Sequence, residues 1–386
     1  MHWKIWKVTS EVFWRPADMV IGIEAAHANK NERTGVEEYC FQVIQELKKI
    51  IPATEQVILY SAEPLRNGLE KMPSHWQVKV LPWPFYKLWS QSRLAWELIC
   101  HPPDVFFAPG QLVPWYTPKK TVTTVHDVAF LSYPRAYRLA GRLYLLAMQS
   151  LIAWRSSRMI TPSIFTKNEL RRYYPKISDN KVTVIPLGLN REYYHPTATD
   201  GKVLEKFGIV KPFIMSIGRL EKKKNTRRII EAFNQIRQGR QLQLVLIGKP
   251  GAGYKPISEA MVKSPYHDDI RELGYLQTND VASLLAQAEV FVFPSLYEGF
   301  GLPLLEAMAA GCPIVTSSLG SLPEVGGEAV CYVNPLYSNA IAKAVSQLLD
   351  DETLGEKYRS RGLERIEKFS WEKTAEDVWR CIVSAR

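Results

Sequence analysis

The 386-residue sequence lacks an uninterrupted apolar run of about 18 residues, which a helix needs to span a membrane. The apolar stretch at residues 143–154 is too short and contains Gln149 and Ser150. Residues 1–17 have neither the apolar core nor the small-residue cleavage site of a signal peptide, so secretion is not expected. We therefore expect a cytoplasmic protein.

Patterns for disulfides and metal sites are also missing. The five cysteines are widely spaced, their number is odd, and no C-x-x-C pair occurs. The seven histidines are scattered along the chain. These observations favour reduced thiols and predict neither a disulfide framework nor a metal site.

Acidic residues are scarce in the first half of the chain. Residues 1–200 contain 25 Lys and Arg against 17 Asp and Glu, a net charge of +8, whereas residues 201–386 contain 24 against 22, a net charge of +2. A basic half can face nucleic acid, anionic lipid or an acidic acceptor, or its charge can serve solubility alone.

Aromatic and basic residues alternate at residues 83–96. Nucleic-acid-binding sheets use such interleaving, but the spacing of Leu88, Ser92 and Trp96 predicts a helix, so we expect no nucleic-acid partner. A peripheral contact of this basic half with the inner face of the cytoplasmic membrane is one expectation. For the aromatic and basic residues 1–17, packing on the protein's own surface is favoured over a membrane contact.

The rest of the chain is organised around residues 294–313, P-S-L-Y-E-G-F-G-L-P-L-L-E-A-M-A-A-G-C-P. A predicted strand at 290–293 leads into a loop with Gly299 and Gly301. Pro303 suits the first turn of a following helix, because its missing N–H would have no partner there, and Gly311 ends that helix. The free N–H groups of such a helix start bind anions, and the glycines allow close approach of a phosphate.

Two glutamates flank this helix start. Glu298 precedes the helix and Glu306 lies about one turn inside it, so they reach different parts of one ligand. Carboxylates would repel a diphosphate, which makes hydroxyl groups their expected partners. The implied ligand is a diphosphate between two polyols, a nucleotide sugar. The alternative is an ordinary strand, loop and helix with two solvated glutamates.

The frame P-S-x-x-E-G-F-G-x-P-x-x-E-A-M-A-x-G resembles the signature of the retaining family 4 glycosyltransferases, which have the GT-B fold. The resemblance implies that Glu306 holds the ribose hydroxyls and Glu298 the hydroxyls of the donor sugar. It also implies that the intervening loop, Gly299, Phe300, Gly301 and Leu302, binds the donor.

A second motif follows a predicted strand at 213–217, in the string G-R-L-E-K-K-K-N. It resembles the family motif in which an Arg and a Lys clamp the diphosphate, here Gly218-Arg219 and Lys224, and these fixed cations would take the place of a metal. Asn225 is predicted to cap the next helix, and Lys222 and Lys223 are predicted to be solvated. Further along, L-G-Y-L resembles the loop around the donor base and makes Tyr275 a candidate contact, with a packed strand tyrosine as the alternative.

The first half supplies three more candidates. Gly35 in T-G-V-E-E-Y resembles the glycine loop that faces the donor phosphates, and an ordinary turn is the alternative. His126 and Asp127 follow a predicted strand at 121–125, at the end of a parallel strand where α/β sheets bind ligands. H-D-V-A-F resembles the position at which the family presents a histidine to the donor sugar. His126 would either hydrogen-bond the sugar or steady charge at the reacting carbon.

Strands alternate with helices in both halves, which predicts an α/β protein with two doubly wound, Rossmann-like domains facing a cleft, the GT-B fold. We predict an N-terminal extension (1–18), an acceptor-binding domain (19–200) and a nucleotide-sugar-binding domain (201–368). The last segment (369–386) is expected to be a helix that crosses back to the first domain.

By resemblance, the protein is a retaining hexosyltransferase that uses a GDP- or UDP-sugar, no metal and no other cofactor, and a glycan or lipid-linked acceptor. The strings H-D-V-A-F and T-G-V-E-E-Y are similar to those of the mannosyltransferase branch. His126, Glu298, Arg219 and Lys224 are the expected catalytic residues. One alternative is a nucleotide-sugar epimerase, which would release free sugar without an acceptor. Another is a silent subunit that binds the donor without transfer or hydrolysis.

Overall fold

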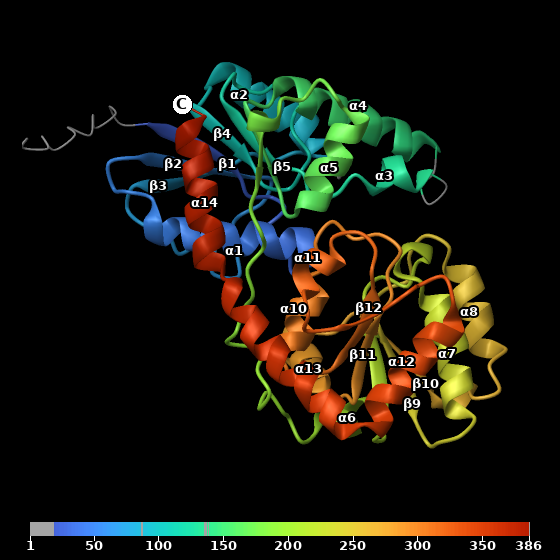
Figure 1. The fold of residues 1–386 in the computed structure, drawn as a ribbon. Helices are drawn as coiled ribbons and strands as arrows, with labels where there is room; N and C mark the ends of the chain where they lie inside the picture. Colours follow the sequence, from blue (N-terminus) through green and yellow to red (C-terminus); the bar gives the residue numbers. More distant parts are fainter. Residues whose placement is uncertain (1–18, 86–87, 135–136, 138, 386) are drawn as a thin grey trace, which may run out of the picture.

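The computed structural model describes residues 19–85, 88–134, 137 and 139–385. The predicted N-terminal extension therefore lies outside the described residues. Two parallel sheets with helices on both faces form the molecule (Figure 1), which confirms the predicted α/β class. Their strand orders are β3-β2-β1-β4-β5-β6-β7 and β10-β9-β8-β11-β12-β13.

The first sheet and its helices come from the first half of the chain. The strands are β1 (Val20–Glu24), β2 (Gln56–Ser61), β3 (Trp76–Val80), β4 (Val105–Ala108), β5 (Thr121–Thr124), β6 (Arg158–Thr161) and β7 (Val182–Val184). The helices are α1 (Gly35–Ile50), α2 (Ala95–Cys100), α3 (Ala129–Ser132), α4 (Leu139–Arg155) and α5 (Ile164–Tyr173).

The second sheet comes from the second half. Its strands are β8 (Phe213–Ile217), β9 (Gln243–Ile247), β10 (Ile270–Gly274), β11 (Val290–Phe293), β12 (Ile314–Ser317) and β13 (Cys331–Val333). Its helices are α6 (Val203–Phe207), α7 (Thr226–Arg237), α8 (Tyr254–Val262), α9 (Thr278–Leu285), α10 (Leu302–Ala309), α11 (Leu322–Gly326), α12 (Ser338–Asp350) and α13 (Glu352–Arg365). The predicted strands at 213–217 and 290–293 are confirmed to the residue.

The central strands are buried on both faces. In β4 all four residues are buried; Phe107 packs in the core that contains α1, and Phe106 in the core on the other face. Successive side chains of a strand point to opposite faces, so an apolar strand without alternation is what a sheet covered by helices requires. No helix in the described ranges combines the length and apolarity needed to cross a bilayer.

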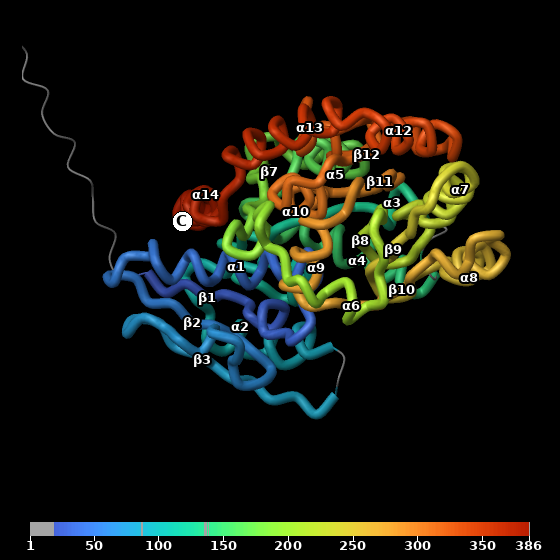
Figure 2. Tube along the Cα trace, turned by 90° about the horizontal axis from the view of Figure 1, so that it is seen from below, coloured from blue at the N-terminus to red at the C-terminus, as the bar shows by residue number. Residues whose placement is uncertain are grey.

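The last helix, α14 (Trp371–Ser384), packs against α1 of the first sheet. Figure 2 shows α12, α13 and α14 following one another along one side of the molecule, so the chain crosses between the two halves a second time. The two crossings touch: the Thr374 hydroxyl donates to the Pro186 carbonyl at 2.8 Å, and a Cβ on Gly188 would lie 2.3 Å from the Trp371 nitrogen. The boundaries at residues 200 and 368 stay predictions.

The predicted helix at residues 83–96 is wrong in its first half. Leu88 has a φ of +66°, and regular structure begins only with a π-helix at Ser90–Leu94, followed by α2. Prolines at positions 82 and 84 explain the difference, because each lacks an N–H and biases the preceding residue away from helical angles. Of the three residues predicted to share a face, only Ser92 and Trp96 are helical.

Candidate active site

A cleft of about 1580 Å³ separates the two halves and is lined by every site residue that the sequence predicted. The second half contributes the ends of β8, β10 and β11 and the start of α10. The first half contributes the end of β5 and the start of α1. These segments follow the carboxyl ends of parallel strands, where α/β sheets bind ligands. From the two halves the cleft brings together His126, Asp127, Gly35, Gly218, Arg219, Lys224, Tyr275, Glu298, Gly299, Phe300, Gly301, Leu302 and Glu306.

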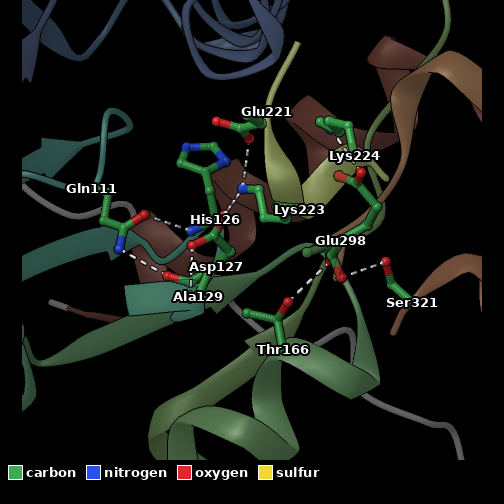
Figure 3. Close-up of polar contacts among 11 residues, drawn as sticks. Gln111, His126, Asp127, Ala129, Thr166, Glu221, Lys223, Lys224, Glu298 and Ser321 are labelled. Atoms are coloured by element: carbon green, nitrogen blue, oxygen red, sulfur yellow. Dashed lines mark hydrogen bonds and ion pairs between the residues drawn. The ribbon is translucent and has the colours of Figure 1, made fainter. Parts of the chain in front are cut away.

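Lys224 and Glu298 form an ion pair in the cleft (Figure 3). The Lys224 Nζ donates to Glu298 Oε1 at 2.6 Å, and it also lies 5.1 Å from the centre of the Phe293 ring. The side chain of Glu298 is 10% exposed and that of Lys224 is 19% exposed, so the pair is largely shielded from water. The sequence analysis assigned Lys224 to the diphosphate and Glu298 to the donor sugar. Because the two side chains are paired here, a bound diphosphate would have to compete with Glu298 for the lysine.

Asn225 does not cap α7 as predicted. It has a φ of +62° and its side chain makes no cap hydrogen bond. Its amide instead donates to the carbonyls of Pro294 (3.1 Å) and Pro335 (2.7 Å). A buried amide is satisfied equally well by carbonyls from elsewhere in the fold, and here it ties the turn that carries Lys224 to the end of β11.

Lys223 was predicted to be solvated, which is wrong, whereas Lys222 is exposed as expected. The Lys223 Nζ lies 3.8 Å from Asp127 of the first half and 3.8 Å from Glu221 (Figure 3). Burial favours the neutral amine, but the carboxylates of Asp127, Glu298 and Glu221 outweigh it and raise the pKa of Lys223. Lys223 therefore stays charged and links the two sides of the cleft.

His126 is buried and neutral. Burial lowers its pKa to about 4. Its Nε2 lies 2.7 Å from the Pro109 carbonyl, which can only accept, so Nε2 carries the proton and Nδ1 is left as an acceptor. Gln111 fixes the backbone here, since its Oε1 accepts from the His126 nitrogen and its Nε2 donates to the Asp127 carbonyl (Figure 3). Of the two roles the sequence left open, a neutral ring fits a hydrogen bond to a sugar hydroxyl.

Gly299 serves the contact between the two halves. A Cβ at this position would lie 2.0 Å from the His126 carbonyl oxygen. The Gly299 carbonyl also accepts from the hydroxyls of Ser163 (2.7 Å) and Thr166 (3.0 Å), at the start of α5. The sequence analysis had assigned Gly299 to the close approach of a phosphate. In the structure a side chain at this position is excluded by the backbone of His126, in the first half of the chain.

A second contact lies next to this one. The carboxylate of Glu324, in α11, accepts from the backbone nitrogens of Ile164 (2.7 Å) and Phe165 (2.6 Å). These N–H groups belong to the first turn of α5, where they have no partner within the helix. The start of α5 is thus held by the loop that contains Gly299 on one side and by α11 on the other.

The helix start predicted at Pro303 is confirmed, with Gly301 at the N-cap position of α10 and a φ of +111°. That backbone angle favours glycine. The Phe300 side chain is buried against Phe369, 6.1 Å between ring centres, so only its backbone is suited to a ligand. Gly35 faces Leu302 across the cleft, and a Cβ on Gly35 would still lie 3.7 Å from that side chain.

Glu306 faces two residues that the sequence did not single out. Burial, reinforced by the Glu38 carboxylate of α1, raises the pKa of Glu306 to about 7, and the Tyr194 hydroxyl hydrogen-bonds the carboxyl group. Glu38 lies within the string T-G-V-E-E-Y, which the sequence analysis had linked to the cleft through Gly35 and not through Glu38. Tyr194 lies shortly before the predicted domain boundary at residue 200, where nothing in the sequence pattern marked it.

We expect the carboxyl group of Glu306 to make stability depend on pH. Its folded pKa lies above the ordinary value of 4.5, so its contribution to stability is complete below pH 4.5 and is lost as pH rises through about 7. The free energy of unfolding should fall by roughly 1 to 3 kcal/mol across this window, and Glu306→Gln should flatten that part of the curve. Urea denaturation at several pH values measures the difference between the two proteins. Parallel curves for both proteins would contradict the assignment.

At the other end of the cleft, Tyr275 lies under a lysine. The Lys249 Nζ is 5.5 Å from the centre of the Tyr275 ring and forms an ion pair with Glu32 of the first half. The ring thus lines the cleft without being a core tyrosine, in a position suited to stacking against a flat base. Arg219 is exposed to the cleft and, within the described part of the chain, forms no ion pair. No group of three or more His, Cys, Asp or Glu among the described residues is arranged to hold a metal ion.

Comparison with known proteins identifies the family of this chain. The family model "Glycosyltransferase Family 4" matches residues 33–193, and "Glycosyl transferases group 1" matches residues 204–365. Over 292 residues the chain is 31% identical to the O-antigen chain mannosyltransferase B of Escherichia coli, a match that covers 74% of this chain and 76% of that protein. The chain belongs to the family 4 glycosyltransferases.

Solved structures agree with the fold of this glycosyltransferase. Sucrose-phosphate synthase of Thermosynechococcus elongatus superposes with a TM-score of 0.75 at 21% identity, over 95% of this chain and all of that one. HepE of Anabaena, solved in complex with UDP-glucose, superposes with a TM-score of 0.72 at 17% identity, over 95% of this chain and 100% of that one. The GT-B fold predicted from the sequence is confirmed.

Proposed function

We propose that this glycosyltransferase transfers mannose from a nucleoside diphosphate mannose to a glycan or lipid-linked acceptor, with retention of the anomeric configuration. The observation that carries the proposal is the convergence of Arg219, Lys224, Glu298 and Glu306 on one cleft opposite His126. The similarity to a mannosyltransferase supports the choice of sugar. Retention rests on the resemblance of the Glu298 frame to the retaining family.

The diphosphate fits the cationic part of the cleft. Departure of the nucleoside diphosphate builds negative charge on its oxygens, and fixed cations stabilise that charge. Arg219 and Lys224 reach the cleft from the turn after β8, and the free N–H groups at the start of α10 add a positive dipole end. These groups supply the charge without a metal, so we propose metal-independent transfer.

The hydroxyl-binding groups lie on either side of this cationic part. Glu306, beside Tyr194, would accept hydrogen bonds from the ribose, and Tyr275 lies where it can stack on the base. Glu298, once Lys224 turns to the phosphates, would accept from the sugar hydroxyls together with the His126 Nδ1. The solved complex of HepE with UDP-glucose supports a nucleotide sugar as the donor.

Calorimetric titration with GDP, UDP and ADP in EDTA tests the donor site first. We expect one of them to bind without metal. The matching sugar nucleotides, GDP-mannose among them, are then assayed for slow hydrolysis and for transfer to mannose-terminated acceptors, and proton NMR gives the anomeric form of the product.

Three outcomes would contradict the proposal. Binding only after addition of Mg²⁺ would exclude the metal-free site. Release of free epimerised sugar without an acceptor would indicate the epimerase. Tight donor binding with neither hydrolysis nor transfer would indicate a silent binding subunit.

A further inference from the structure

Helix α4 presents an apolar face to solvent. Only two of its side chains, Gln149 and Ile152, are buried. The exposed positions recur at intervals of three and four residues, so they share one side of the helix. We call this side the α4 face; it consists of Ala140, Leu143, Tyr144, Ala147, Ser150 and Trp154.

No charged residue belongs to the α4 face, and its large side chains are well exposed. Leu143 is 56% exposed and Trp154 is 74% exposed. A surface helix ordinarily turns its apolar side to the core and its charged side to water. Contiguous apolar surface of this kind marks a contact with another molecule.

Neighbouring residues extend the face. Gln91 accepts from the backbone nitrogen of Trp115 at 2.8 Å and hydrogen-bonds the Tyr144 hydroxyl, which sets Trp115, itself 52% exposed, beside α4. The Arg155 guanidinium lies 4.6 Å from the centre of the Trp154 ring and edges the face with positive charge. A tryptophan next to an arginine is typical of surfaces that lie at the boundary between lipid headgroups and acyl chains.

The segment around α4 is almost free of acidic residues. Residues 105–168 contain eight Lys and Arg and one acidic residue, Asp127. That carboxylate lies in the cleft, 3.8 Å from Lys223. Within the described residues, Arg142 and Arg155 form no ion pair. Cations without an acidic partner on the helix that carries the apolar face are complementary to an anionic surface.

We propose that the α4 face is a docking surface for a bilayer that contains anionic phospholipid. Apolar side chains enter the interfacial layer, and the surrounding cations attract the headgroups. A second copy of the chain fits the surface less well, since two copies would bring like charges together. Figure 1 shows α4 on the outer side of the first half.

Docking in this way would bring the cleft to the membrane. Tyr137 lines the cleft and lies two residues before α4 begins at Leu139. A bilayer seated on the α4 face therefore lies close to one end of the cleft, where a lipid-linked acceptor could enter. The docking itself does not depend on which sugar is transferred.

Co-sedimentation of the full chain with liposomes tests the proposal. We expect binding to mixed phosphatidylcholine and phosphatidylglycerol liposomes at low salt, and much weaker binding to pure phosphatidylcholine or at high salt. The double variant Leu143→Glu, Trp154→Glu should lose at least about tenfold in apparent affinity, because two apolar groups are replaced by charges that headgroups repel. Its circular dichroism should stay that of the wild type, since both side chains are exposed.

Val262→Glu is the matched control, because Val262 is 75% exposed but lies on α8 of the second half. It should bind liposomes as the wild type does. Absence of wild-type binding to anionic liposomes, or an equal loss in both variants, would overturn the proposal. So would a dimer in sedimentation velocity that the double variant abolishes while lipid binding is absent, because the α4 face would then belong to a second copy.

Discussion

Lys224→Ala should lower the rate of transfer by about 10²- to 10³-fold, or roughly 3 to 4 kcal/mol, which is the loss seen when a fixed donor to a developing anion is removed. The lysine is held in the cleft by Glu298 at 2.6 Å, so it is already placed for the diphosphate before the donor arrives. Removing it takes away the cation and leaves a shielded carboxylate beside the phosphates. Initial rates of nucleotide release under saturating donor give the effect.

Lys222→Ala is the matched control for this substitution. Lys222 lies two residues earlier on the same turn, and its side chain is exposed. It should transfer at the wild-type rate. An equal loss of activity in the two variants would mean that only the total positive charge of the turn matters. Full activity of Lys224→Ala would show that this lysine does not take part in transfer.

Gly299→Ala should keep the two halves of the protein from closing on one another. The added methyl group would lie 2.0 Å from the His126 carbonyl, a separation that no rotation of a methyl group relieves. Because the loop also carries Glu298, a shift of about 1 Å should cost on the order of 10²-fold in transfer. We expect the variant to fold, since neither sheet is touched, and small-angle scattering should show a larger radius of gyration.

Gly201→Ala provides the comparison, because a Cβ there would meet nothing within 4 Å. It should match the wild type in rate and in scattering. A Gly299→Ala protein with the wild-type radius and rate would show that this contact is not needed for catalysis.

The strongest parts of the sequence pattern predicted the fold well. β8 and β11 were predicted to the residue, because each is a short apolar run ended by glycine or proline. The frame from Glu298 to Glu306 was recognisable because one loop and one helix position all its parts. Local signals of this kind do not depend on the other half of the chain.

The contacts that individual side chains make were harder to predict than the fold. Lys223 appeared as one more lysine of a surface run, yet its partner Asp127 lies almost a hundred residues earlier, on the other side of the cleft. Asn225 is of a residue type that often caps helices, but its side-chain amide donates to two proline carbonyls in loops distant in the sequence. Tyr194 and Glu306 are far apart in the sequence and meet only in the folded protein. Contacts that join separate parts of the fold leave no periodic signal.

The chain passes between the two halves twice, and the passages touch where Gly188 meets Trp371 with no room for a side chain. The segment before α6 and the start of α14 are held together at this point, which can serve as the axis of a hinge. Sliding of one half past the other would tear this contact, whereas rotation about it leaves the contact intact. We therefore expect the cleft to open by rotation of the two halves about this contact.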